Sequence, residues 1–98
     1  MLFPKINLHL HSTYSDGKNN IKKIVNLALD SSFEYIAITD HFTDSSKANL
    51  IPTLDTMEKI SQYLNEIAEC QLYLKKTNKN LNLLKGIEID LESSEQHL

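Results

Sequence analysis

Residues 6–17 read Ile-Asn-Leu-His-Leu-His-Ser-Thr-Tyr-Ser-Asp-Gly. Apolar residues alternate with Asn7, His9 and His11 at the start of this stretch, and a period of two indicates a β-strand. The same period places the imidazoles of His9 and His11 on one face, a few ångströms apart. Two neutral imidazoles that point to one place suit a borderline cation such as zinc, manganese or iron. For a His-x-His pair taken alone, the alternative is an exposed strand edge without a function.

The strand runs into Ser-Asp-Gly at residues 15–17. Gly17 permits a tight turn, because glycine has no side chain to obstruct one. Such a turn would let the carboxylate of Asp16 fold back toward the histidines. The sequence therefore predicts that Asp16 joins His9 and His11 at one site.

The composition is that of one small globular domain, with 98 residues, of which 41% are apolar and 23% charged. A formal net charge of −3 gives no strong attraction to nucleic acid or to anionic membranes. All the basic residues are lysines, so the chain offers no arginine clamp for phosphate. Cys70 is the only cysteine, which excludes an internal disulfide and favours a reducing, cytoplasmic location. No segment has the pattern of a signal peptide or the length of a membrane span, so no membrane partner is expected.

Apolar runs and helical periodicities predict an α/β fold with the order β-α-β-α-β. We expect strands over residues 5–11, 33–40 and 82–90, and helices over residues 20–31 and 54–76. This order implies parallel strands joined by right-handed crossovers. In a barrel wall, both helices would cover the same face of the sheet.

The second predicted helix carries one apolar stripe. Its members are Leu54, Met57, Ile60, Leu64, Ile67, Gln71 and Leu74. Asp55 with Glu58 resembles a capping box at the start of this helix. Met57 and Cys70 are expected in or near the core. We assign Cys70 no role as nucleophile or ligand, because it lies on a helix flank away from the strand ends.

Five side chains that can bind metals fall at one end of the predicted sheet. His9 and His11 end the first strand, His41 follows the second, Glu88 lies near the end of the third, and Asp16 lies in the first loop. In parallel sheets, active sites collect at the carboxyl ends of the strands. The predicted topology therefore brings these side chains together without reference to any family.

Four motifs resemble the PHP (polymerase and histidinol phosphatase) superfamily. They are His-Leu-His at 9–11, Ser-Asp-Gly at 15–17, Thr-Asp-His at 39–41 and Gly-Ile-Glu at 86–88. The resemblance extends from about residue 7 to about residue 91. It implies a distorted α/β barrel and metal-dependent hydrolysis of phosphoesters.

The resemblance also implies a role for each matching residue. His9 and His11 would bind a first metal together with Glu88, and Glu88 would bridge to a second metal. Asp16 and His41 would belong to a third metal site. The complete family site would thus hold up to three divalent ions, which would be zinc, manganese or iron.

The implied chemistry is attack of a metal-activated water on phosphorus, with His9, His11 and Glu88 acting through the bound metal. Coordination by a metal lowers the pKa of water to about 7. Asp40 would orient a ligand or its neighbours from outside the metal shell.

The family completes its metal cluster with residues beyond the third strand. Here His97 is the only histidine after Glu88, and it lies in a polar tail. A closed α/β barrel also typically takes ~200 residues or more. We therefore expect residues 1–98 to be the N-terminal portion of a single PHP domain.

Three functions remain open. In the first, the chain is part of a phosphoesterase that acts on a small phosphorylated substrate, a nucleotide or a DNA end. In the second, it is the PHP module of a DNA polymerase, with an exonuclease or a structural role. In the third, it is an inactive fragment with an incomplete metal site. The absence of arginine argues mildly against DNA as the substrate. The sequence does not indicate an oligomeric state.

Overall fold

A computed structural model describes residues 5–42 and 54–89. Its elements, in order, are β1 (Ile6–Leu10), α1 (Ile21–Asp30), β2 (Tyr35–Phe42), α2 (Met57–Lys76) and β3 (Asn82–Ile89). The predicted β-α-β-α-β order is confirmed, and each boundary lies within a few residues of its prediction. Asp90 and His97 lie outside the described residues.

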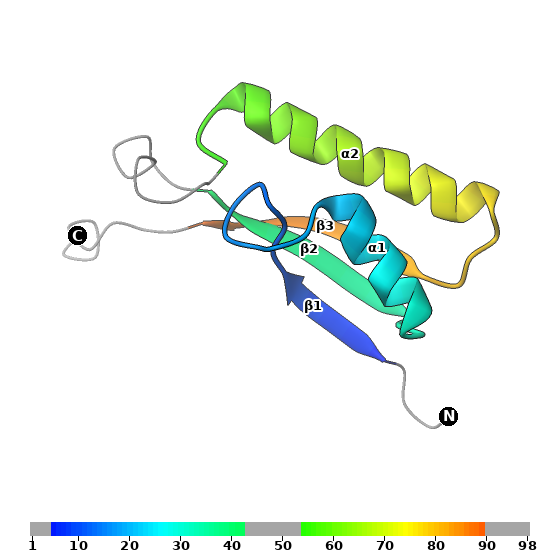
Figure 1. Cartoon of the computed structure of the whole chain (residues 1–98). Coiled ribbons are helices and arrows are strands. Elements are labelled where there is room, and N and C mark those ends of the chain that lie inside the picture. The colour runs from blue at the N-terminus through cyan, green and yellow to red at the C-terminus, as the bar shows by residue number, and fades with distance from the viewer. Residues whose placement is uncertain (1–4, 43–53, 90–98) are drawn as a thin grey trace.

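The three strands form one parallel sheet with β2 in the centre (Figure 1). β2 and β3 pair in continuous register from Tyr35↔Asn82 to Phe42↔Ile89. This pairing sets His41 directly opposite Glu88. The carboxyl ends of all three strands therefore point toward the same end of the molecule, as their parallel direction requires.

Both helices pack on one face of the sheet. Buried apolar side chains from α1, α2, β2 and β3 form a single cluster there. Its members include Ile21, Ile24, Val25, Ala28, Ile36, Ile38, Ile67, Leu74 and Leu83. The prediction of helices on a shared face, as in a barrel wall, is confirmed.

The start of α2 differs from the predicted capping box. The N-cap is Thr56, whose hydroxyl accepts a hydrogen bond of 3.1 Å from the Lys59 N–H. Asp55 instead pairs with the Lys59 ammonium at 2.9 Å. Thr56 is the better cap because the helix begins one residue later than the box requires, so the hydroxyl lies in reach of the free N–H groups.

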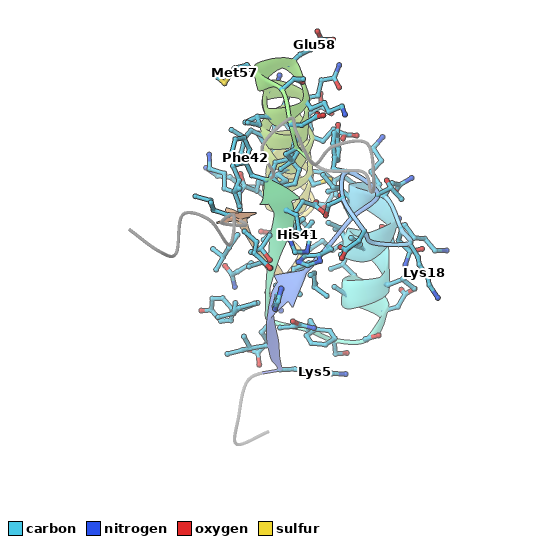
Figure 2. The ribbon with its side chains drawn as sticks, turned by 90° about the vertical axis from the view of Figure 1, so that its left-hand side faces the viewer. Lys5, Lys18, His41, Phe42, Met57 and Glu58 are labelled. Atoms are coloured by element: carbon cyan, nitrogen blue, oxygen red, sulfur yellow. The ribbon has the colours of Figure 1, made fainter. Side chains whose placement is uncertain are left out.

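The apolar stripe of α2 is confirmed along most of its length, but Met57 is 77% exposed. Met57 is the first residue of α2, and its side chain projects outward from that end of the helix (Figure 2). Cys70 is buried, as predicted. Tyr63 is fully buried although the predicted stripe omitted it.

The other face of the sheet carries no helix of the described chain. Tyr35 and His41 lie on it, because they alternate along β2 with the core residues Ile36 and Ile38. Leu84, opposite Ala37 on this face, is 46% exposed.

Within residues 5–42 and 54–89, no helix has the length and apolar character needed to cross a membrane.

Candidate metal centre

β1 contains a bulge beside His9. Its pairing with β2 steps from Asn7↔Ile36 to Leu10↔Ile38, so β1 advances by three residues (7 to 10) where β2 advances by two (36 to 38). The strict period of two that the sequence suggested for β1 is therefore wrong. The N–H of His9 donates to Asn7 Oδ1 at 3.0 Å, which supports the irregular turn of the chain.

The bulge decides which side chains face the core. Asn7 and Leu10 both pair with core residues of β2, so the extra residue, within Leu8–His9, projects away from the helices. Leu8 is 55% exposed, whereas Leu10 packs against the core. After the bulge, alternation resumes and leaves His9 and His11 on the helix-free face. Bulges commonly redirect side chains in this way beside active sites.

Asp40 organises the loop that follows β1. Its buried carboxylate accepts hydrogen bonds from the Ser12 N–H (2.7 Å), the Ser12 hydroxyl (2.6 Å) and the Ser15 hydroxyl. Several donors are needed to stabilise a carboxylate that is removed from water. These bonds fix both ends of residues 12–15. His11 immediately precedes this segment and Asp16 immediately follows it.

Gly17 closes the loop because the chain returns against its own start. A Cβ at this position would lie 2.0 Å from the carbonyl oxygen of His11 and 2.5 Å from its carbonyl carbon. Neither glycine has a positive φ, so close approach, not left-handed backbone, requires glycine here. The Gly17 N–H donates to the Ser12 carbonyl at 2.9 Å. This return brings Asp16 back to His11, as the sequence predicted.

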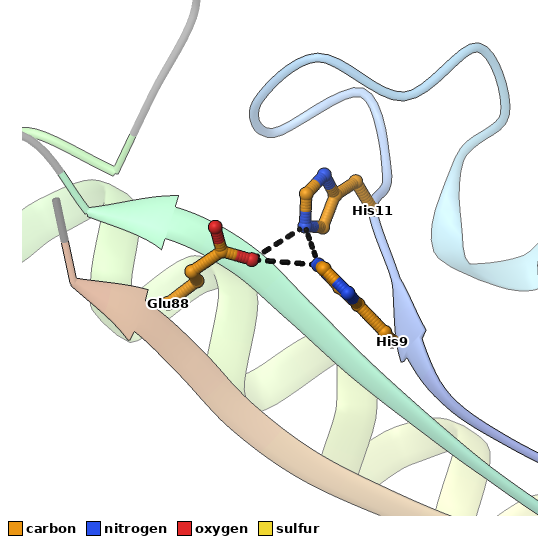
Figure 3. Close-up of side chains that lie close together, drawn as sticks. All are labelled: His9, His11 and Glu88. Carbon is orange, nitrogen blue, oxygen red and sulfur yellow. Dashed lines mark hydrogen bonds and ion pairs between the residues drawn. The ribbon is translucent and has the colours of Figure 1, made fainter.

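His9, His11 and Glu88 meet at one point. Figure 3 shows the histidines projecting from β1 and its end, and Glu88 from β3, toward one another over the central strand. Glu88 Oε1 lies 2.7 Å from His9 Nε2 and 3.1 Å from His11 Nε2, and the two Nε2 atoms are 3.0 Å apart. Three atoms with lone pairs therefore form a compact triangle.

Asp16 and His41 extend this triangle into a cluster of five side chains. Asp16 Oδ1 lies 2.6 Å from His11 Nδ1, and Asp16 Oδ2 lies 3.4 Å from His41 Nε2. Glu88 uses its second oxygen toward His41, with 3.4 Å between Oε2 and Nδ1. The rings of His11 and His41 are 4.3 Å apart at their centroids. The structure therefore brings all five predicted ligand residues together at the carboxyl end of the sheet.

The cluster changes the pKa values of three of its members. Burial of His11 opposes protonation, but hydrogen bonds to Glu88 and Asp16 outweigh burial and raise its pKa above 6.5. The hydrogen bond with His11, joined by that with His9, lowers the pKa of Glu88 below 4.5. Burial works against ionisation of Asp16, yet the hydrogen bond and charge of His11 lower its pKa below 3.8. Without a metal, the cluster therefore favours a protonated His11 between two carboxylates.

The donor set fits a divalent cation. His9, His11 and Glu88 form one group whose ligand atoms lie within 4.8 Å of one another, and His11, Asp16 and His41 form another. Two ligands on a tetrahedral zinc lie roughly 3.3 Å apart, given bonds of about 2.0–2.1 Å. The 2.7–3.1 Å triangle needs only slight opening to reach this spacing. A cation bound here would replace the proton on His11.

The sequence did not reveal the side chains that support the cluster. Ser12, Ser15 and Tyr63 all contact Asp40, and all three are buried. Ser15 is the first residue of the Ser-Asp-Gly motif and Ser12 directly follows the His-Leu-His motif, so their positions were a usable signal. Tyr63 is separated from every motif and carried no signal beyond its place on an amphipathic helix.

The fold and the cluster together define an α/β protein with a histidine–carboxylate cluster that could hold a metal ion at the carboxyl end of a parallel sheet. The sequence model of the PHP domain matches residues 7–98, so the chain belongs to the PHP domain family. It is also similar to the DNA polymerase/3'-5' exonuclease PolX of Bacillus subtilis (strain 168), with 34% identity over 87 residues. That alignment covers 89% of this chain but 14% of the relative, so the chain spans a small part of the relative's length.

Proposed function

We propose that this chain is part of a metal-dependent phosphoester hydrolase. The observation that carries the proposal is the meeting of His9, His11 and Glu88 at distances of 2.7–3.1 Å, within a chain of the PHP family. These three residues would hold the first divalent ion. Histidine and carboxylate ligands suit zinc, manganese or iron.

The remaining members of the cluster would serve adjacent ions. The two oxygens of Glu88 face different histidines, which suits a carboxylate that bridges two ions. Asp16 and His41 would contribute to a third ion on the other side of His11. Asp40 would keep His11 and Asp16 in place through the loop that it binds.

Bound divalent ions would supply an activated water and neutralise charge on the phosphoryl oxygens. The chain's own residues would position these ions and set their protonation requirement, since His11 must lose its proton to act as a ligand. The His9 side chain is 66% exposed, so the centre is open to solvent, and thus to a substrate, in the described chain.

We further propose that residues 1–98 are the N-terminal portion of a PHP domain and that further ligands come from polypeptide outside this chain. Hydrolysis of p-nitrophenyl phosphate with manganese or zinc tests the function. We expect little or no turnover by the 98-residue chain, because two-metal hydrolysis needs both the attacking and the leaving oxygen held. A polypeptide containing the whole domain should be active, and His9→Ala should abolish that activity. An inactive whole domain, with metal bound, would contradict the proposal.

A DNA end is the second candidate substrate. Its support is the similarity to a protein named as a DNA polymerase and 3'-5' exonuclease. Incubation of the whole-domain polypeptide with a 5'-labelled single-stranded oligonucleotide and, separately, with histidinol phosphate distinguishes the two. Stepwise shortening of the oligonucleotide supports an exonuclease, and phosphate release from the small ester alone supports a phosphatase. If a whole domain that binds metal acts on neither substrate, a structural role within a polymerase is favoured.

A further inference from the structure

The phenol oxygen of Tyr63 contacts the backbones of two neighbouring strands. It lies 2.6 Å from the carbonyl oxygen of Gly86 on β3 and 2.8 Å from that of Ile38 on β2. It also accepts a hydrogen bond of 3.1 Å from the N–H of Asp40. A phenol has one proton, so it donates to one carbonyl at a time or divides the bond between them. One side-chain atom thus joins β2 and β3 where both approach the metal centre.

These backbone contacts adjoin the proposed ligands. Asp40 directly precedes His41, and Gly86 lies two positions before Glu88 (86 to 88). His41 and Glu88 are directly opposed across the two strands. A shift of either strand at the phenol would therefore move one of these side chains relative to the other. Their separation of 3.4 Å depends on a fixed spacing between the strands.

Tyr63 also meets the loop that carries Asp16. Its ring packs edge-to-face against the ring of Tyr14, with centroids 5.5 Å apart. Burial, joined by the interaction with Glu66 one turn further along α2, raises the pKa of the Tyr14 phenol to about 12. Burial raises the pKa of the Tyr63 phenol to about 12, so the hydroxyl keeps its proton at neutral pH. α2 therefore supports β2, β3 and the loop from a single point.

We propose that Tyr63 is a positioning residue of the metal centre, which holds His41 and Glu88 in register through hydrogen bonds to the strand backbones. This inference rests on the proposed metal site. The competing explanation is that Tyr63 only fills the core. A phenylalanine would fill the same space but leave the buried N–H and carbonyl groups without their partner, so the hydroxyl can be tested separately from the ring.

Tyr63→Phe is the test variant, with two matched controls on the same helix. Tyr73→Phe removes the hydroxyl of a tyrosine that is 49% exposed. Ile67→Val trims a fully buried side chain that lies one turn from Tyr63 and takes no part in the hydrogen bonds. Urea unfolding curves, recorded at several temperatures, first identify a temperature at which every variant is fully folded in the absence of urea. If Tyr63→Phe does not fold in buffer, all four proteins are compared in trimethylamine N-oxide, which stabilises compact states.

The first readout is the dissociation constant of Zn²⁺, measured by competition with a chromophoric chelator. We expect Tyr63→Phe to weaken zinc binding about tenfold or more, as is typical when the support of a metal ligand is lost. Both controls should stay within about twofold of the wild type. Wild-type affinity in Tyr63→Phe, or an equal loss in Ile67→Val, would overturn the proposal.

The second readout needs no metal and separates this inference from the proposed function. The rings of His11 and His41 have centroids 4.3 Å apart, so their protons should give a nuclear Overhauser effect in the metal-free protein. We expect this signal to be lost or strongly weakened in Tyr63→Phe and kept in both controls. If the wild type does not bind zinc, the proposed function fails, and the Overhauser signal alone decides the role of Tyr63. An Overhauser signal that is unchanged in Tyr63→Phe would then contradict the positioning role of Tyr63.

Discussion

Glu88 Oε1 lies 2.7 Å from His9 Nε2, although 79 positions separate the two residues in the chain. The contact spans the whole sheet, since His9 belongs to β1, Glu88 to β3, and β2 runs between them. It therefore depends on the register of both strand pairs and on the bulge in β1.

The stability of the metal-free protein should be greatest at mildly acidic pH. The pKa of His11 is raised above 6.5 by folding, so its contribution is present below 6.5 and is lost as pH rises through the raised value. The pKa values of Glu88 and Asp16 are lowered, so their contributions are present above 4.5 and 3.8 and are lost as pH falls through the lowered values. Urea unfolding in EDTA between pH 3 and 9 should therefore show a maximum at about pH 4.5–6.5.

Bound zinc should reverse the loss of stability that the metal-free protein shows at alkaline pH. Metal and proton compete for His11, so the stabilisation that zinc provides should grow as pH rises through the pKa of the imidazole. His11→Ala should remove both the alkaline loss without metal and the gain with zinc. A metal-free protein that becomes steadily more stable from pH 5 to pH 9 would contradict the assigned environment of His11.

Gly17→Ala should be far more damaging than Gly86→Ala. The added methyl group at Gly17 would lie 2.0 Å from a backbone oxygen, whereas at Gly86 it would lie 3.1 Å from the methyl group of Thr39, which must give by only a few tenths of an ångström. We expect Gly17→Ala to lower the free energy of unfolding by about 2–3 kcal/mol or more, because the loop must move. Gly86→Ala should cost less than about 1 kcal/mol. Chemical denaturation measures both, and equal costs would show that the loop does not return against His11.

Asp40→Asn should weaken both the fold and the metal centre. The amide keeps one acceptor oxygen but turns an N–H₂ group toward the Ser12 and Ser15 donors. We expect a loss of about 2–4 kcal/mol in the free energy of unfolding, since charge-assisted bonds to a buried carboxylate are lost. Asp30→Asn, at an exposed site on α1, should change stability by less than about 0.5 kcal/mol. If the two variants unfold at the same urea concentration, Asp40 does not hold the loop.

Hydrophobic periodicity and strand ends were sufficient to predict the element order and the meeting of the five ligand residues. Parallel strands bring their carboxyl ends together, so His41 and Glu88 could be placed without a structure. The bulge at Leu8–His9 could not be predicted, because register depends on a partner strand that the local sequence does not specify.

The role of Tyr63 and the exposure of Met57 were both missed by the apolar stripe predicted for α2. The stripe included Met57 and omitted Tyr63. In the structure Met57, the first residue of α2, is 77% exposed, whereas Tyr63 is fully buried and reaches backbone groups of β2 and β3. Periodicity gives the face of a helix and not its position along the sheet.

Metal binding by the cluster is tested most directly by titrating Zn²⁺ into the wild type, His9→Ala, Glu88→Gln and the exposed control Glu58→Gln. Competition with a chromophoric chelator at pH 7.5 gives the dissociation constants, and urea unfolding in EDTA confirms that every variant is folded. The proposed centre predicts that the wild type and Glu58→Gln bind zinc alike. It also predicts that His9→Ala and Glu88→Gln bind at least about 100-fold more weakly, since each has lost a direct ligand. Zinc affinity that is absent from the folded wild type, or unchanged in both ligand variants, would contradict the existence of this metal centre.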